Sequence, residues 1–141
     1  MESKNTSSPV SSNGRTIAYW ITTAFVAANL GVGAVCDILQ IPYIQAMALH
    51  LGYPGYLTYI LGAWEVFGTI ALLIPRFPLL KEWAYAGAFF LFTGAVASRI
   101  AVGDGAGLIV PPIIFACLTV ASWYLRPPSS RLVSSDYKHG L

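Results

Sequence analysis

The side chains in this sequence that are best suited to chemistry are ionisable groups inside long apolar segments. Glu65 lies within GAWEVFGTIALLIPR, and Asp37 and Arg99 lie within two other segments of the same kind. A charge in the hydrocarbon of a membrane is costly, so such residues pair, become neutral or line water. These three residues are therefore the candidate catalytic residues.

The three groups could divide the work of acid–base catalysis. Glu65 would act as general acid or base, Asp37 would orient it or a water molecule, and Arg99 would stabilise developing negative charge. Arg99 itself needs an acidic partner, because a guanidinium does not lose its proton. Asp37 is nearest in depth, Glu65 is within reach of a bent arginine, and Asp104 is within reach of an extended one. If Asp37 takes the arginine, we expect Glu65 to be protonated near neutral pH.

Counting along the expected helices gives the depth of each group. Glu65 falls near the middle of the membrane, and Asp37 and Arg99 fall roughly 10 Å toward the face away from the termini. We therefore expect one cavity that opens to this outer face, with no buried ionisable group in the inner half. The candidate ligand-binding residues lie between the middle and the outer face: Asn29, Tyr59, Asp104 and His50.

Small and polar residues share the helix faces that carry the two acids. One face carries Thr58, Gly62, Glu65 and Thr69, and another carries Thr22, Asn29, Gly33 and Asp37. Residues three and four positions apart lie on one side of a helix, so these faces point the carboxyl groups inward, away from lipid. The same pattern also suits a buried polar network that only fixes helix packing, so both interpretations stay open.

The elements that would position these residues are membrane spans. The chain is 56% hydrophobic and only 10% charged, against about 25% charged in soluble domains. Four segments are long enough to cross a hydrocarbon core about 30 Å thick: residues 17–39, 56–74, 83–102 and 107–125. We predict an all-α, integral membrane four-helix bundle over residues 16–126, with flexible cytoplasmic ends at residues 1–15 and 127–141.

The basic residues predict the orientation of the bundle. All lysines and arginines except Arg99 fall on the side of the two termini. By the positive-inside rule, both termini are cytoplasmic.

Two connections are unusual. In IPYIQAMALHLGYPGY the apolar residues recur at helical spacing, which predicts a short helix on the outer membrane surface between the first two spans. In the last span, Pro111 and Pro112 allow two arrangements. Either the helix starts near Ala106 and bends at the prolines, or its outer part is irregular.

Several functions are disfavoured. The net charge of +2 and the lack of a basic stripe argue against nucleic-acid binding. His50 and His139 fall on opposite faces of the membrane, and Cys36 and Cys117 lie at different depths. We therefore expect no metal site, no haem site and no disulfide.

The sequence also carries a resemblance to a known family in LGYPGYLTYILGAWEVFGTIALLIPRFPLLKEWAYAGAFF, ASRIAVGD and SWYLRPP. Over about residues 17–128 it resembles the DoxX-like family of small four-helix membrane proteins. Relatives include the membrane subunit of a thiosulfate:quinone oxidoreductase, proteins associated with oxidative or thiol stress, and distant eukaryotic members that assist receptor assembly. The resemblance marks Glu65, Asp104 and the position of Arg99, where many relatives would have histidine. This departure disfavours proton shuttling at position 99, because a guanidinium does not titrate.

The resemblance and the polar residues favour a quinone-linked redox component of a bacterial cytoplasmic membrane. A quinone or similar amphipathic molecule would enter the outer cavity, and its carbonyl oxygens would meet Arg99 and protonated Glu65. Apolar walls would come from Phe92, Leu61 and Ile60. No haem, flavin or iron–sulfur motif is visible, so we expect no intrinsic cofactor, and the electrons would come from a redox partner subunit.

Two alternatives belong to other classes of protein. One is a self-sufficient membrane enzyme, an isomerase or hydrolase, that uses Glu65 as acid or base on a lipophilic substrate. The other is a non-enzymatic assembly factor or chaperone with a structural polar core. The partners considered are the lipid bilayer, a lipophilic small molecule, a redox partner subunit and a second copy of the chain in a homodimer.

Overall fold

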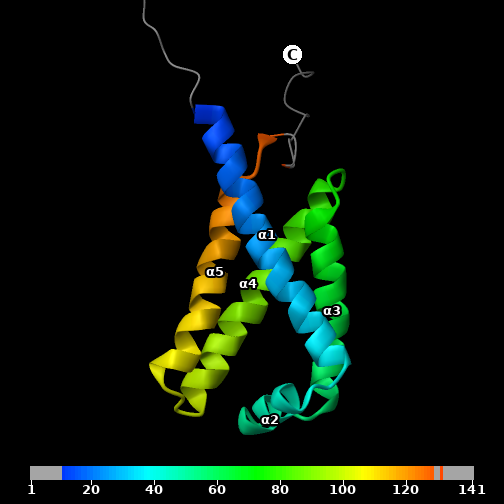
Figure 1. Cartoon of the computed structure of the whole chain (residues 1–141), viewed down its shortest axis with the longest axis vertical. Helices are drawn as coiled ribbons and strands as arrows, with labels where there is room; N and C mark the ends of the chain where they lie inside the picture. The colour runs from blue at the N-terminus through cyan, green and yellow to red at the C-terminus, as the bar shows by residue number, and fades with distance from the viewer. Residues whose placement is uncertain (1–10, 129–130, 132–141) are drawn as a thin grey trace, which may run out of the picture.

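The computed structural model of the chain describes residues 11–128 and 131, and all regular elements within them are helices (Figure 1). They are α1 (Ser11–Ile38), α2 (Pro42–His50), α3 (Tyr56–Leu73), α4 (Pro78–Ala101) and α5 (Ala106–Leu125). Of these described helices, α1, α3, α4 and α5 are long and apolar enough to cross a membrane. The predictions of an all-α fold with four spans and of a short helix after the first span are confirmed.

Three helix starts refine the predicted boundaries. α1 begins at Ser11, so residues 11–15 are helical although the sequence suggested a flexible end. α4 begins at Pro78, earlier than predicted, because proline suits the first position of a helix, where its missing N–H costs nothing. α5 begins at Ala106 and continues through Pro111 and Pro112, which matches the first of the two expected starts. Most of the two predicted flexible ends lies outside the described residues.

The helices form two antiparallel pairs joined into a bundle. α1 packs most extensively against α3, α4 packs against α5, and α1 also contacts α5, whereas the contact between α3 and α4 is smaller. α1 starts and α5 ends at one end of the bundle, here called the terminal end, where the α3–α4 loop also lies (Figure 1). The opposite end, here called the α2 end, holds α2 and the α4–α5 loop.

Glycines allow α1 and α3 to approach closely. A Cβ atom on Gly62 would lie 3.2 Å from the backbone oxygen of Ala34 and 3.0 Å from Cβ of Asp37. A Cβ atom on Gly31 would lie 3.7 Å from the methyl group of Thr69. The small residues that the sequence placed beside the two acids therefore form the α1–α3 contact.

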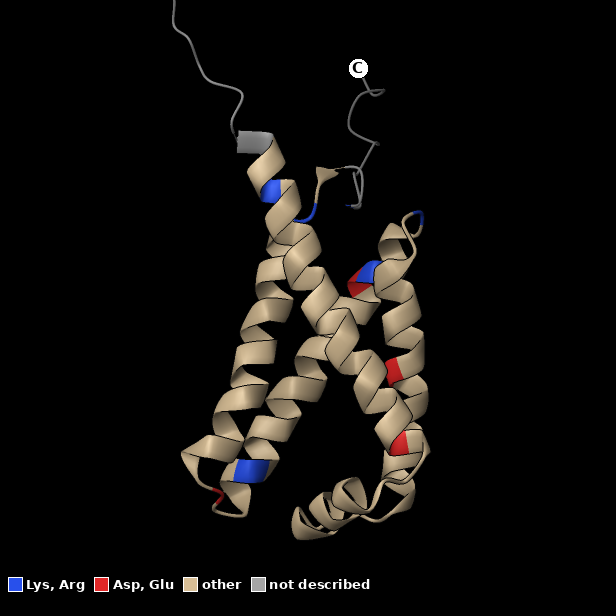
Figure 2. Cartoon of the chain, in the orientation of Figure 1, with Lys and Arg blue, Asp and Glu red and all other residues tan. Residues whose placement is uncertain are grey.

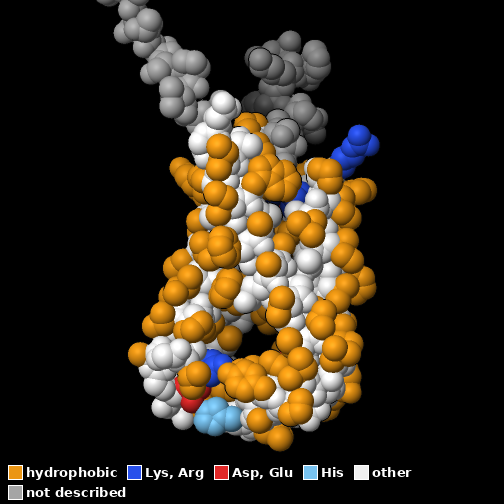
Figure 3. All heavy atoms as spheres, in the orientation of Figure 1, with side chains coloured by type: hydrophobic (Ala, Val, Ile, Leu, Met, Phe, Trp, Pro, Cys, Tyr) orange, Lys and Arg blue, Asp and Glu red, His pale blue; other side chains and the backbone are white. Residues whose placement is uncertain are grey.

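The interior is small and the exterior is apolar. Buried side chains of the core include Val26, Leu30, Leu72, Tyr85 and Phe92. Large apolar side chains cover much of the face shown in Figure 3. The exposed apolar residues of the molecule include Trp64 and Phe90, each 70% exposed. A surface of this kind suits lipid rather than water, and it agrees with four membrane-spanning helices.

α2 crosses the α2 end of the bundle (Figure 1). Its predicted apolar residues Ile44, Met47 and Ala48 are half-buried or buried, so they face the protein. Tyr43 and Leu49 on the same helix are 67% and 69% exposed. α2 therefore turns one apolar face toward the bundle and another away from it.

Candidate functional site

Glu65 lines a groove between α3 and α4. The groove has a volume of about 360 Å³, and its walls are apolar except for the Glu65 carboxyl group. Leu30 of α1 contributes to it, while Trp64 of α3 and Trp83 of α4 are exposed residues on its rim. Since exposed aromatic residues border the groove, it opens to the lipid-facing side of the bundle.

The Glu65 carboxyl group rests against α1 at Gly33, where a larger residue would displace it. A Cβ atom on Gly33 would lie 2.8 Å from Oε2 and 3.0 Å from Oε1 of Glu65. Oε2 is buried and has no hydrogen-bond partner among the described residues. A buried carboxyl oxygen without a partner is costly, so this atom is available to a ligand or a proton.

Asp37 is the second acid at this contact. Asp37 is only 9% exposed, and it lies one turn of α1 after Gly33, against which the Glu65 carboxyl group rests. Within the described part of the chain, the ion pairs join His50 to Asp104, Arg99 to Asp104 and Arg126 to Glu82. Neither Glu65 nor Asp37 takes part in them, so two acids share the α1–α3 contact without a basic partner.

Arg99 does not pair with Asp37, which corrects the favoured prediction. Its Nη1 donates to Asp104 Oδ2 at 3.0 Å, and its Nη2 contacts the Met47 sulfur at 2.9 Å. The reason is the position of Arg99 in the last turn of α4, from which its side chain extends to the α4–α5 loop. Gly103 turns that loop with a φ of 78°, and this brings Asp104 back to the arginine. Of the three acids considered as partners of Arg99, the structure shows Asp104.

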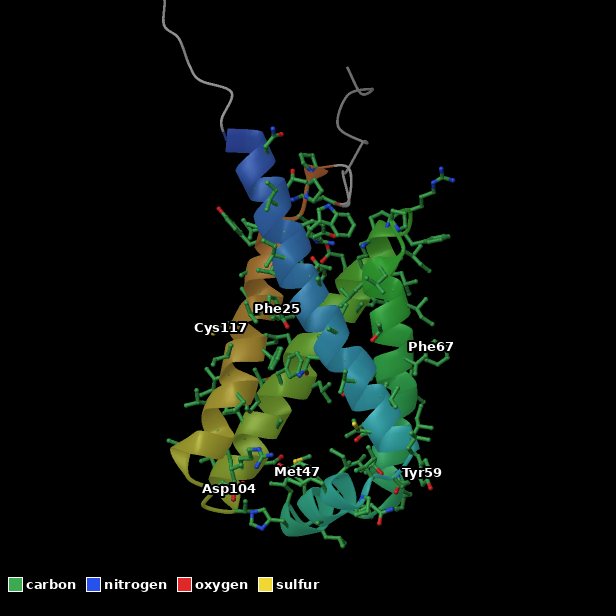
Figure 4. The ribbon with its side chains drawn as sticks, viewed as in Figure 1. Phe25, Met47, Tyr59, Phe67, Asp104 and Cys117 are labelled. Carbon is green, nitrogen blue, oxygen red and sulfur yellow. The ribbon has the colours of Figure 1, made fainter. Side chains whose placement is uncertain are left out.

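His50 completes this second cluster. Its Nε2 lies 2.7 Å from Asp104 Oδ1, so Asp104 joins α2 to α4 (Figure 4). The hydrogen bond to His50 and then that to Arg99 lower the pKa of Asp104 below its ordinary value. The side chain of Asp104 is only 7% exposed, whereas that of His50 is 54% exposed. The predicted site residues thus divide into the two acids Glu65 and Asp37 at the α1–α3 contact and a separate Asp104 cluster.

The other two predicted ligand-binding residues lie apart from the groove. Asn29 is half-buried on α1 and does not line the groove. Tyr59 is 53% exposed on α3 and points away from the bundle (Figure 4). Of the expected apolar walls only Leu61 borders the groove, while Phe92 stacks on Phe115 in the core.

The groove also differs from the predicted cavity in its direction. The sequence predicted a cavity that opens at the α2 end, where Arg99 would meet Glu65. The groove instead runs from Leu61 past Glu65 to Leu80 and Trp83, near the start of α4 at the terminal end. The difference arises because α3 and α4 make the smaller contact and small residues such as Gly68 and Gly87 lie between them.

The terminal end contains buried charges that sequence reasoning missed. Lys81 and Arg126 are 1% and 2% exposed, which contradicts the expectation of no buried ionisable group in the inner half. Lys81 Nζ donates to the backbone oxygen of Leu72 in the last turn of α3. Arg126 pairs with Glu82 and lies 5.2 Å from the centre of the Tyr85 ring. Pro78 is the signal in the sequence that could have placed Lys81 and Glu82 on a helix, because proline is common at the first position of a helix.

A hydroxyl network accompanies these charges. Thr23 and Ser122 are hydrogen-bonded at 2.6 Å, and Tyr85 and Ser122 at 2.8 Å. All three are buried, and they join α1, α4 and α5. Their hydrogen bonds satisfy one another, so this network is explained by packing.

The described residues contain no group of three or more His, Cys, Asp or Glu side chains that could hold a metal ion. Cys36 and Cys117 are both free, as the sequence predicted.

Comparison with known proteins places the chain in a family. The model of the DoxX-like family matches residues 21–122, which include all four spans in large part. No curated protein and no solved structure matches the chain. With its four apolar helices and this match over most of its length, the chain belongs to the DoxX-like family and is an integral membrane protein.

Proposed function

We propose that this protein binds a lipophilic ligand of the quinone class in the groove at Glu65 and serves as a membrane component of a redox system. The observation that carries the proposal is Glu65, which lines an apolar groove and whose buried Oε2 has no partner among the described residues. A site with apolar walls and one directed polar group is the usual form of a small-molecule site.

The chemistry of the groove suits a neutral molecule with a carbonyl oxygen. No described basic residue pairs with Glu65, so a proton is its simplest neutralising partner in this apolar position. A protonated carboxyl group donates one hydrogen bond, and a quinone carbonyl accepts one. The volume of about 360 Å³ is near the lower end of ligand pockets, which begin at about 300 Å³, and it suits a single ring.

The ligand would reach the groove from the bilayer. Trp64 and Trp83 border the groove and are 70% and 69% exposed, so the bound molecule would contact lipid as well as protein. Arg99 would not contact it, because Asp104 and Met47 occupy its guanidinium. We propose that Glu65 is the polar anchor and that a partner subunit supplies the electrons.

The same proposal includes an orientation in a bacterial cytoplasmic membrane. Figure 2 shows most of the basic residues toward the terminal end and one near the α2 end. By their places in the helices and loops, the former are Arg15, Arg76, Lys81 and Arg126 and the latter is Arg99. The positive-inside rule then favours a cytoplasmic terminal end and an external α2 end. On this reading α2 lies at the outer membrane surface, where Tyr43 and Leu49 would contact lipid headgroups.

A second candidate function is supported by the proximity of the two acids. The Glu65 carboxyl group lies against Gly33, one turn of α1 before Asp37, and two acids placed in this way can hold a proton for transfer to a lipophilic substrate. This would make the protein an isomerase or hydrolase. Arg99 has no part in this version, because it lies in the separate Asp104 cluster.

Two substitutions of Glu65 separate these functions. Glu65→Gln keeps a hydrogen-bond donor but no titratable proton, whereas Glu65→Leu removes both. For quinone binding we expect saturable quenching of tryptophan fluorescence by a short-chain quinone in wild type. We expect several-fold weaker binding in Glu65→Gln and loss of saturation in Glu65→Leu. For acid–base catalysis, both substitutions would abolish turnover.

The matched control is Arg76→Gln, because Arg76 is an exposed charge in the α3–α4 loop. It should bind as wild type does. Equal binding in wild type and in folded Glu65→Leu would contradict the proposal, and helicity by circular dichroism reports whether each variant is folded. A wild-type protein that shows no saturable quenching would shift support to an assembly role.

A further inference from the structure

The α2 end of the bundle is spread apart and crossed by α2. The α1–α3 pair and the α4–α5 pair separate toward this end, and α2 lies across the space between them (Figure 1). The space-filling view is hollowed directly beside α2, between the two pairs (Figure 3). α2 makes only a small backbone contact with α3, and its contacts with the other helices are fewer still.

Three side-chain links hold α2 and the turn after it to the α4–α5 pair. His50 Nε2 lies 2.7 Å from Asp104 Oδ1, and Arg99 Nη2 lies 2.9 Å from the Met47 sulfur. The Tyr53 hydroxyl lies 2.5 Å from Oγ of Ser98 on α4. In Figure 4 Met47 of α2 and Asp104 of the α4–α5 loop face one another across this end. Met47 and His50 lie in the second half of α2, and Tyr53 follows it.

The two connections of α2 each contain a residue with left-handed backbone. Gln40 precedes α2 with a φ of 51°, and Gly52 follows it with a φ of 79°. Gln40 is fixed to the α1–α3 pair, because its Nε2 donates to Thr58 Oγ1 at 2.6 Å and to the Asp37 backbone oxygen at 2.5 Å. Gly52 has no atom near the position of a Cβ. Both connections are held in this state, because the Tyr53 N–H after α2 donates to the Ala48 oxygen at 2.9 Å. Gly52 is the residue of the two that can change its backbone conformation at least cost, since glycine adopts both signs of φ.

From this arrangement we propose that α2 is a hinged strap that closes the hollow at the α2 end, and that release of its links to α4 and the α4–α5 loop opens this hollow to water. Asp104 is the centre of the closed state, because it joins the links of His50 and Arg99. The proposal is independent of the Glu65 groove, which lies between α3 and α4.

The test measures the distance between α2 and α5 with spin labels. Labels go on Leu49 and Leu108, which are 69% and 44% exposed, in a background with Cys36 and Cys117 replaced by serine. Pulsed electron paramagnetic resonance should give one narrow Leu49–Leu108 distance distribution for the labelled protein that keeps Asp104 and His50. In Asp104→Asn and in His50→Ala we expect a longer, broader component whose fraction rises at least about threefold, because each removes a charged or hydrogen-bonded link.

Two controls keep this test decisive. Arg76→Gln removes a charge at the terminal end and should leave the distribution unchanged. A second pair of labels on Ile21 and Val120, both exposed in spans away from α2, reports whether the bundle keeps its packing. If the α2–α5 distribution in folded Asp104→Asn and His50→Ala matches that of the unmodified links, the strap proposal is wrong.

Discussion

At the scale of single residues, the unusual features are two ionisable side chains buried in apolar surroundings, Glu65 and Lys81. Glu65 Oε2 has no partner in the described part of the chain, whereas the buried Lys81 has the backbone oxygen of Leu72. The lysine donates to a carbonyl that the end of α3 leaves without a helical N–H, and a cation is favourable there. The lysine therefore has a structural explanation, and the glutamate does not.

Replacement of Lys81 should weaken the fold. Lys81→Met keeps much of the side-chain volume but loses the hydrogen bond to Leu72, and a charged hydrogen bond contributes about 1.5–3 kcal/mol. We expect a loss of this size in the free energy of unfolding, measured by denaturant titration in detergent. Arg76→Met, at an exposed position near the same end, should change stability by less than about 0.5 kcal/mol. Equal stability of the two variants would refute the capping role.

Gly33 should control the position of the Glu65 carboxyl group. A Cβ at position 33 would lie 2.8 Å from Glu65 Oε2, so Gly33→Ala must displace the end of that side chain. We expect weaker quinone binding with little loss of stability, because the end of a glutamate side chain moves easily. Gly94→Ala is the matched control, since nothing lies within 4 Å of a Cβ there. Quinone titrations of both variants check this, and unchanged binding in Gly33→Ala would be evidence against the Glu65 site.

At the scale of elements, α1 and α3 pack tightly against each other, whereas α2 is held to the bundle by few contacts. The tight pair depends on Gly62, where a Cβ would meet the Ala34 backbone oxygen at 3.2 Å and Ile38 Cγ1 at 2.9 Å. The loose element depends on Asp104, which both His50 and Arg99 contact. The two elements should respond to different perturbations.

Gly62→Ala should push α3 away from α1. Backbone cannot yield as a side-chain end does, so we expect a loss of about 1–3 kcal/mol in unfolding free energy, typical of overpacking. Gly68→Ala on the same helix should be tolerated, because its Cβ would lie 3.8 Å from Leu30 Cδ1. Thermal unfolding of the two variants in one detergent makes the comparison, and a Gly62→Ala protein as stable as Gly68→Ala would show that the helices are not in close contact.

The docking of α2 against α4 and the α4–α5 loop should depend on pH. The pKa of Asp104 is lowered in the docked state by His50 and Arg99, while a free aspartate has a pKa of about 3.9. Docking is therefore strengthened at all pH values above about 4, and this contribution is lost as the pH falls through the docked-state pKa. The Leu49–Leu108 label distance, measured from pH 7 down to pH 3, should lengthen only below about pH 4. Asp104→Asn should remove this transition, and a transition that persists in it would assign the effect to another group.

At the scale of the whole molecule, the sequence predicted the helices and one face of the site. The 3.6-residue period put Gly62 and Glu65 on one face of α3, and the structure packs that face against α1. Depth counting could not find the partner of Arg99, because it gives a height along the helix but not the direction of a long side chain. Lys81 was missed for another reason: its burial depends on how α4 begins, and helix starts are the least certain part of sequence interpretation.

The central claim is that a lipophilic ligand binds at Glu65 between α3 and α4, and photo-crosslinking with a quinone probe tests it most directly. Mass spectrometry of the labelled wild-type protein should place the probe on residues of the groove, such as Trp64, Trp83 or Leu91, and Glu65→Leu should remove this label. Labelling between α4 and α5 near Phe89 and Trp123, or equal labelling in folded Glu65→Leu, would contradict the claim.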